Sequence, residues 1–242
     1  MKPFRIAAWT AIAGSVLLTG CMASRLSVSR NLADAARPYS AHPTDPQRTL
    51  LIVGDSTALG TGADSPQSSL AGWIGNAHPQ WRIDNRAANG AKFVDVVQQL
   101  RDADSGYDLV MVVAGGNDVI QLTSMGKIRS GMTEAVALAH ERGRRVVLMP
   151  CGNVGHAPFF LPPLTWWMDT RSKEMHAIAQ SVASTGGARY IRLLQPKESD
   201  PFVQRSDEMN ASDGLHPSSM GYRHWYTELV RQGGLEGLAA DR

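Results

Sequence analysis

Short apolar runs alternate along the chain with longer segments in which apolar residues recur every three or four positions. The runs 50–53 and 108–114 are almost continuously apolar, which is typical of strands buried on both faces of a parallel sheet. Between them, the segment 92–103 repeats its apolar residues at helical spacing, as a helix does that packs on a sheet through one face. This alternation predicts repeated β-α units.

The same pattern continues toward the C-terminal region. Further strands are expected over 81–85, 145–149 and 190–194. Further helices are expected over 69–77, 132–142, 166–184 and 217–231. We therefore expect an α/β fold, a three-layer α/β/α sandwich built on a five-stranded parallel sheet. Ligands of such sheets bind beyond the carboxyl ends of the strands.

The first 20 residues have the pattern of a signal peptide. Lys2 and Arg5 give a positive start, and the mostly apolar run 6–18 is short for a membrane span. The run ends in Leu-Thr-Gly-Cys, which resembles the bacterial lipoprotein cleavage box, in which the cysteine is lipidated. The resemblance implies a lipid anchor on Cys21 and a place on a membrane of the bacterial cell envelope, and Met22 favours the outer membrane. The alternative is a plain secretory signal followed by a chance cysteine.

The segment 21–47 carries three prolines and no sustained apolar period, so we expect a tether between the membrane and the domain. The domain is then expected over 48–242, a length that suits one sizeable α/β unit. Without Lys2 and Arg5 the chain has 22 basic and 22 acidic residues and thus no net charge. The charge therefore does not predict binding to nucleic acid.

Metal and cofactor motifs are missing from the sequence. It has no His-Glu-x-x-His, paired cysteines, dense carboxylate cluster, phosphate loop or dinucleotide fingerprint, so we expect neither a metal nor a cofactor. Cys151 follows an apolar run and has no histidine motif nearby. It is expected to be a small buried residue, with a catalytic thiol as the less favoured alternative.

Ser56 is the candidate nucleophile because it directly follows the expected strand 50–53 on a turn that begins with Gly54. A serine needs a base within hydrogen-bond reach at neutral pH. Of the seven histidines, only His216 has a carboxylate, Asp213, placed within one turn to orient it. The remaining histidines are expected to be surface or core residues: 42, 78, 140, 156, 176 and 224.

Acyl transfer also needs donors for the oxyanion. The backbone N–H groups of Ser56 and Gly90 and the side-chain amide of Asn117 are the candidates, and all three follow expected strands. Taken singly, Asn117 also suits an ordinary turn and Asp213 a helix cap.

Four motifs agree in order and spacing with a known family. They are Gly-Asp-Ser at 54–56, a turn glycine at 90, Gly-x-Asn-Asp at 115–118 and Asp-x-x-His at 213–216. Together they resemble the blocks of the SGNH (GDSL-type) hydrolases over roughly 50–225. The resemblance implies a flavodoxin-like fold, with Ser56 as nucleophile, His216 as base and Asp213 as its orienter. It also implies an oxyanion hole formed by Ser56, Gly90 and Asn117.

The resemblance implies a serine ester hydrolase that cleaves an acyl or acetyl ester through an acyl-enzyme. Lipid, glycan and small-molecule esters are all compatible with the motifs. Two alternatives stay open: an acyltransferase on an envelope glycan, and a ligand-binding lipoprotein with a silent site. The aromatic loop 155–167 is expected either to line an acyl or sugar pocket or to pack beneath the loop itself. Asp55 and Asp118 are expected to be structural, and Thr57 stands where many relatives carry Leu.

Overall fold

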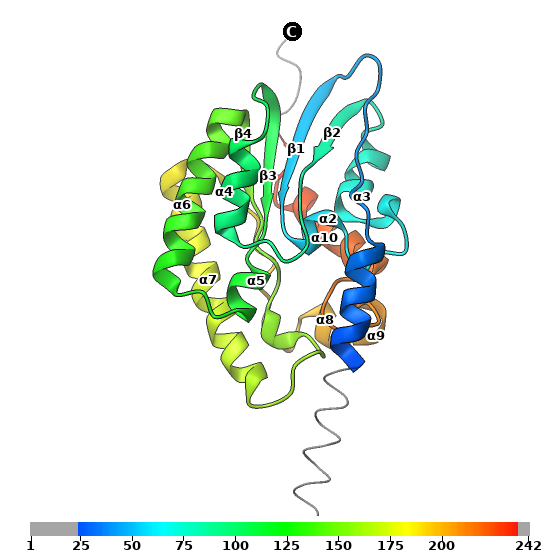
Figure 1. The fold of residues 1–242 in the computed structure, drawn as a ribbon, viewed down its shortest axis with the longest axis vertical. Helices are drawn as coiled ribbons and strands as arrows, with labels where there is room; N and C mark the ends of the chain where they lie inside the picture. The colour runs from blue at the N-terminus through cyan, green and yellow to red at the C-terminus, as the bar shows by residue number, and fades with distance from the viewer. Residues whose placement is uncertain (1–23, 237–242) are drawn as a thin grey trace, which may run out of the picture.

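The computed structural model describes residues 24–236. The expected signal peptide and Cys21 lie outside the described residues. A five-stranded, fully parallel sheet in the order β2-β1-β3-β4-β5 forms the middle layer, and helices cover both faces (Figure 1). This order is that of the flavodoxin-like doubly wound sheet. The expected α/β fold with a five-stranded parallel sheet is confirmed.

The elements have the following bounds. The strands are β1 (Arg48–Gly54), β2 (Trp81–Asn85), β3 (Tyr107–Val113), β4 (Gly143–Leu148) and β5 (Arg189–Tyr190). The long helices are α3 (Leu70–Ala77), α4 (Phe93–Arg101), α6 (Met125–Arg142), α7 (Leu164–Gly186) and α10 (Ser219–Arg231). The short helices are α2 (Ser56–Leu59), α5 (Gly116–Ile120), α8 (Pro201–Gln204), α9 (Ser206–Met209) and the 3₁₀ turns η1 (Pro66–Ser68) and η2 (Val154–His156). A further helix covers 24–35.

The core lies on both faces of β1 and β3. The side chains of 50–53 and 109–113 are at most 1% exposed, because α4, α6 and α7 form a layer on one face of the sheet and α3 and α10 form the other. This double coverage explains why both strands are continuous apolar runs with no polar alternation.

Two elements differ from their expected bounds by more than two residues. Helix α6 begins at Met125, seven residues before the expected start, and Ser124 caps it by accepting a hydrogen bond from the Lys127 backbone. Strand β5 ends at Tyr190, although 190–194 was expected. Beyond it, Ile191 still donates to the Leu148 carbonyl of β4 at 3.0 Å, and the Gln232 side chain bonds both backbone groups of Arg192, at 2.8 and 3.0 Å.

The described part of the expected tether is folded onto the domain. After the helix over 24–35, Ala41 and Ile83 exchange two backbone hydrogen bonds of 3.0 and 2.8 Å in an antiparallel bridge beside β2. Tyr39 packs so tightly on Gly75 of α3 that a Cβ there would lie 2.4 Å from its ring. Residues 24–47 therefore belong to the folded unit, because these contacts with distant residues replace the apolar period that the segment lacks.

Candidate active site

Ser56 stands at the carboxyl end of β1 on a tight turn into α2. Gly54 has φ 154°, and a Cβ on it would lie 1.9 Å from the Val113 carbonyl oxygen of β3, so only glycine allows β1 and β3 to approach here. Asp55 caps α2, since its Oδ1 accepts hydrogen bonds from the Thr57 backbone at 2.9 Å and hydroxyl at 2.7 Å. The turn thus holds Ser56 at the edge of the sheet.

His216 reaches Ser56 from the loop before α10. Its Nε2 lies 2.9 Å from Ser56 Oγ, and its Nδ1 lies 2.6 Å from Asp213 Oδ2. Gly62 makes this approach possible: it has φ 95°, and a Cβ on it would meet the His216 Cβ at 2.9 Å. The Tyr222 hydroxyl, which donates to the Thr61 carbonyl at 2.7 Å, ties α10 to the same turn. The structure therefore brings together the three residues that the sequence paired.

Asp213 is buried and holds the histidine through two kinds of contact. Its Oδ1 accepts the backbone N–H groups of Leu215 at 2.9 Å and His216 at 3.1 Å, while its Oδ2 faces the ring. Burial by itself raises the pKa of Asp213, but the hydrogen bond from the His216 ring and those from the backbone outweigh it and hold the pKa below its ordinary value. The carboxylate is thus ionised where it can fix the tautomer of the ring.

The candidate oxyanion donors lie on neighbouring turns. Asn117, in α5, donates from Nδ2 to the Ala91 carbonyl at 3.1 Å, one residue beyond Gly90. Within residues 24–236, the backbone N–H groups of Ser56 and Gly90 have no hydrogen-bond acceptor. Ser56 and Asn117 line the same cleft, but Gly90 is not among the residues that line it. The structure therefore places two of the three donors in the cleft and the third beside them.

A cleft of about 810 Å³, including the space that opens to solvent, lies over Ser56, Asn117 and His216. Its apolar wall consists of Ile120, Val154, Ala157, Leu193, Phe202, Leu215 and Trp225. A hydroxyl with a base in reach, free N–H donors and an apolar wall suit nucleophilic attack on the carbonyl of an acyl group.

Asp118 and Cys151 have structural positions. Asp118 Oδ2 accepts the Phe93 backbone N–H at 3.0 Å and so caps the start of α4. Cys151 lines the cleft but is 7% exposed, and burial raises the pKa of its thiol. A neutral thiol is a poor nucleophile, which disfavours a catalytic role.

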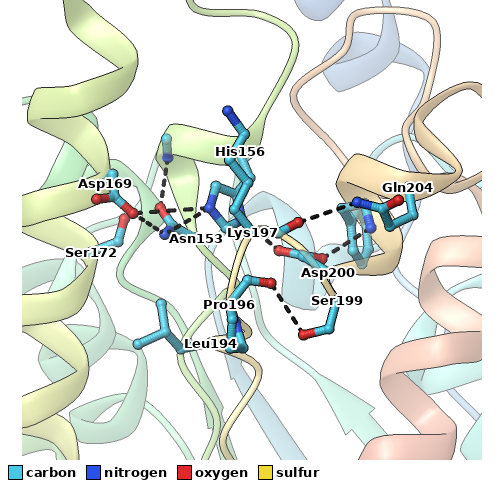
Figure 2. A network of polar contacts seen from close by, with 12 residues as sticks. Asn153, His156, Asp169, Ser172, Leu194, Pro196, Lys197, Ser199, Asp200 and Gln204 are labelled. Carbon is cyan, nitrogen blue, oxygen red and sulfur yellow. Dashed lines mark hydrogen bonds and ion pairs between the residues drawn. The ribbon is translucent and has the colours of Figure 1, made fainter.

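Two histidines besides His216 line the cleft, His156 and His224, and the sequence analysis placed neither of them there. The side chain of His156, in η2, is 6% exposed, and its Nδ1 lies 2.6 Å from Asp200 Oδ2 (Figure 2). On its other side, Asn153 Nδ2 lies 3.3 Å from Nε2 and donates to Asp169 at 2.6 Å. No signal in the sequence pairs His156 with Asp200, because 44 positions separate them. His176, by contrast, is a core residue held by the Cys151 carbonyl and the Tyr190 hydroxyl.

None of the four aromatic residues of the loop 155–167 lines the cleft over Ser56. Phe159 and Phe160 are buried and pack edge to face, whereas Trp166 and Trp167 are exposed. Within residues 24–236, no helix is both long enough and apolar enough to cross a bilayer. Over the same range, no three His, Cys, Asp or Glu side chains are grouped to hold a metal ion.

Known proteins resemble the chain in both sequence and fold. The model of the GDSL-like lipase/acylhydrolase family matches residues 52–224. A GDSL-like esterase of Mycobacterium tuberculosis is 27% identical over 199 residues, which cover 76% of this chain and 59% of the relative. The chain thus spans about three fifths of the length of that relative.

Solved structures share the fold. A lipase/acylhydrolase of Enterococcus faecalis has a TM-score of 0.58 at 24% identity and covers 77% of this chain and 95% of its own. The acetylxylan esterase Axe2 of Geobacillus stearothermophilus has a TM-score of 0.58 at 17% identity, with 81% and 98% covered. The family match spans all four motifs, so this chain belongs to the GDSL-like lipase/acylhydrolase family.

Proposed function

We propose that this protein is an ester hydrolase and that Ser56, His216 and Asp213 act as its catalytic triad. The observation that carries the proposal is the unbroken chain of contacts from Ser56 Oγ through the His216 ring to Asp213, at 2.9 and 2.6 Å. Ser56 Oγ attacks the ester carbonyl while its proton passes to Nε2 of His216. Asp213 accepts a hydrogen bond from the Nδ1–H group and so stabilises the imidazolium that forms.

The tetrahedral intermediate then collapses. Its oxyanion accepts hydrogen bonds from the Ser56 and Gly90 backbone N–H groups and the Asn117 amide, and the His216 proton passes to the leaving alkoxide oxygen. This releases the alcohol and leaves an acyl-enzyme on Ser56. A water, deprotonated by His216, attacks the acyl carbonyl, and the same proton returns to Ser56 Oγ as the acid leaves.

The acyl part of the substrate is proposed to lie along the apolar wall of the cleft. Seven apolar side chains, Phe202 and Trp225 among them, line this wall, which is more apolar lining than the single methyl group of an acetyl ester needs and favours a longer acyl chain over acetate. Glycan, lipid and small aryl esters share the steps above. An acyltransferase on an envelope glycan differs only in the last step, in which a sugar hydroxyl replaces the water.

The lipid anchor on Cys21 is part of the proposal. It places the enzyme on a membrane of the bacterial cell envelope, held by the acyl chains on that cysteine. The support is the Leu-Thr-Gly-Cys motif at 18–21 after a short apolar run. Replacement of Cys21 by Ser should release the protein from the membrane fraction.

A series of aryl esters of increasing acyl length tests the proposed activity. The purified protein should hydrolyse them, with the fastest rates beyond acetate, and the Ser56→Ala variant should not. Addition of a sugar acceptor distinguishes hydrolysis from acyl transfer. A hydrolase releases free acid at an unchanged rate, whereas an acyltransferase forms the sugar ester. Absence of any acyl release or transfer by the wild-type protein would favour a silent binding site.

A further inference from the structure

The first turn of α7 exposes three large apolar side chains. Trp166 is 70% exposed, Trp167 49% and Leu164 40%, and we call these three residues the tryptophan edge. Of the large apolar residues that the structure describes, Trp166 is the most exposed. Neighbouring exposed apolar side chains of this size are typical of a surface that binds a membrane or another protein.

The helix over 24–35 begins beside this edge. Arg25 donates from Nη1 to the carbonyls of Pro158 at 2.7 Å and Phe159 at 2.8 Å, in the loop that leads into α7. Pro158 and Trp166 line one groove. Figure 1 shows the start of this helix and the start of α7 at the same end of the molecule. The described chain therefore begins next to the tryptophan edge.

The chain between Cys21 and this helix is so short that a lipid on Cys21 would lie close to the tryptophan edge. Only Met22 and Ala23 lie between Cys21 and residue 24, so the two positions are three steps apart along the chain. A chain spans at most about 3.6 Å per residue, so a lipid on Cys21 leaves the start of the helix within about 11 Å of its attachment point. This step rests on the lipid anchor proposed above.

We infer that the tryptophan edge lies in the interfacial layer of the bilayer that holds Cys21, and that the active site takes its ester from that bilayer. Tryptophan favours this layer because its ring is apolar and its N–H is polar. The same loop connects the edge to the site: Ala157 lines the cleft, and Leu164 begins α7 seven residues later. The substrate class is thus a lipid ester.

Tryptophan fluorescence tests the contact without reference to activity. The lipidated protein is bound to vesicles of phosphatidylethanolamine with a minority of phosphatidylglycerol, with or without brominated acyl chains. Bromine should quench part of the emission, and the Trp166→Ser/Trp167→Ser variant should lose the quenched part. Val230 is the matched control, because it is 44% exposed in the last turn of α10. The tryptophan added by Val230→Trp should not be quenched.

Activity supplies the second arm. The Trp166→Ser/Trp167→Ser variant should keep the wild-type rate on a soluble aryl ester and lose about tenfold or more on an ester lipid in vesicles. The Val230→Ser variant should keep both rates. An equal ratio of the two rates in the tryptophan variant and the wild type would overturn the inference, as would an unquenched wild-type protein that pellets with vesicles.

The remaining outcomes distinguish a failure of this inference from a failure of the proposed lipid anchor or of the proposed catalytic triad. A wild-type protein that hydrolyses the soluble ester but does not pellet with vesicles overturns the anchor and, with it, this inference, while the triad stands. A protein that pellets and is quenched but hydrolyses neither ester supports the docking and contradicts the proposed triad. Vesicle-free dimers that the tryptophan substitutions dissociate would identify a second copy as the occupant and overturn the inference.

Discussion

Ser56 Oγ lies 2.9 Å from Nε2 of His216, although 160 positions separate the two residues in the chain. The contact forms because β1 and the loop before α10 both end at the carboxyl edge of the sheet, where Gly62 leaves room for the histidine. The fold itself therefore holds together the hydroxyl and the imidazole that we propose as nucleophile and base.

Loss of the base should abolish turnover as completely as loss of the nucleophile. We expect His216→Ala to lower kcat on a soluble aryl ester by about 10⁴-fold or more, and the Ser56→Ala/His216→Ala double variant to be no worse, since the two residues act as one unit. Steady-state kinetics with circular dichroism checks this. His156→Ala is the control, because its ring faces Asp200 and has no contact with Ser56. An effect of His156→Ala equal to that of His216→Ala would contradict the assignment of the base.

Removal of the Asn117 amide should destabilise the transition state and leave substrate binding nearly unchanged. Asn117→Ala is expected to cost about 2.7–4 kcal/mol, which appears as a drop in kcat of about 10²–10³ with little change in KM. The exposed Asn76 of α3 provides the control, and its Ala variant should keep the wild-type kcat. A rise in KM with kcat unchanged would show that Asn117 holds the ground state and not the oxyanion.

Replacement of two glycines by alanine should change the free energy of unfolding in opposite directions. In Gly54→Ala the new Cβ meets the Val113 carbonyl oxygen at 1.9 Å, so β1 and β3 must separate, and we expect a loss of about 3 kcal/mol or more in the free energy of unfolding. In Gly126→Ala, within α6, nothing lies within 4 Å of the added Cβ. That variant should gain about 0.5–1 kcal/mol. Urea denaturation measures both, and a stable Gly54→Ala protein would contradict the close approach.

His176 should make the protein less stable in mild acid. Burial lowers the pKa of His176 to about 4, so the unfolded chain binds a proton below about pH 6.5 that the folded protein does not bind until about pH 4. Stability is then lost as the pH falls through this window, by about 3 kcal/mol in all. Urea denaturation from pH 7 to pH 4 should show a shallower slope for His176→Gln than for the wild type. Parallel slopes would exclude the buried neutral ring.

The parts of the fold that the sequence predicted are those whose signal is local. The runs in β1 and β3 are continuously apolar because both faces of the sheet are covered, and the Asp213–His216 pair lies within one turn. Helix 24–35 has no such signal, since Arg25 stabilises it through carbonyls more than 130 positions away. The contact of His156 with Asp200 likewise joins residues 44 positions apart. These features depend on the tertiary fold and could be seen only there.

Covalent labelling of Ser56 tests the central claim most directly. A fluorophosphonate that mimics an ester should react once per chain, and peptide mass spectrometry should find the adduct on the hydroxyl of Ser56. The His216→Ala variant should react far more slowly, and the Ser56→Ala variant should not react. An adduct on another residue, or equal labelling of the Ser56→Ala protein, would contradict the account.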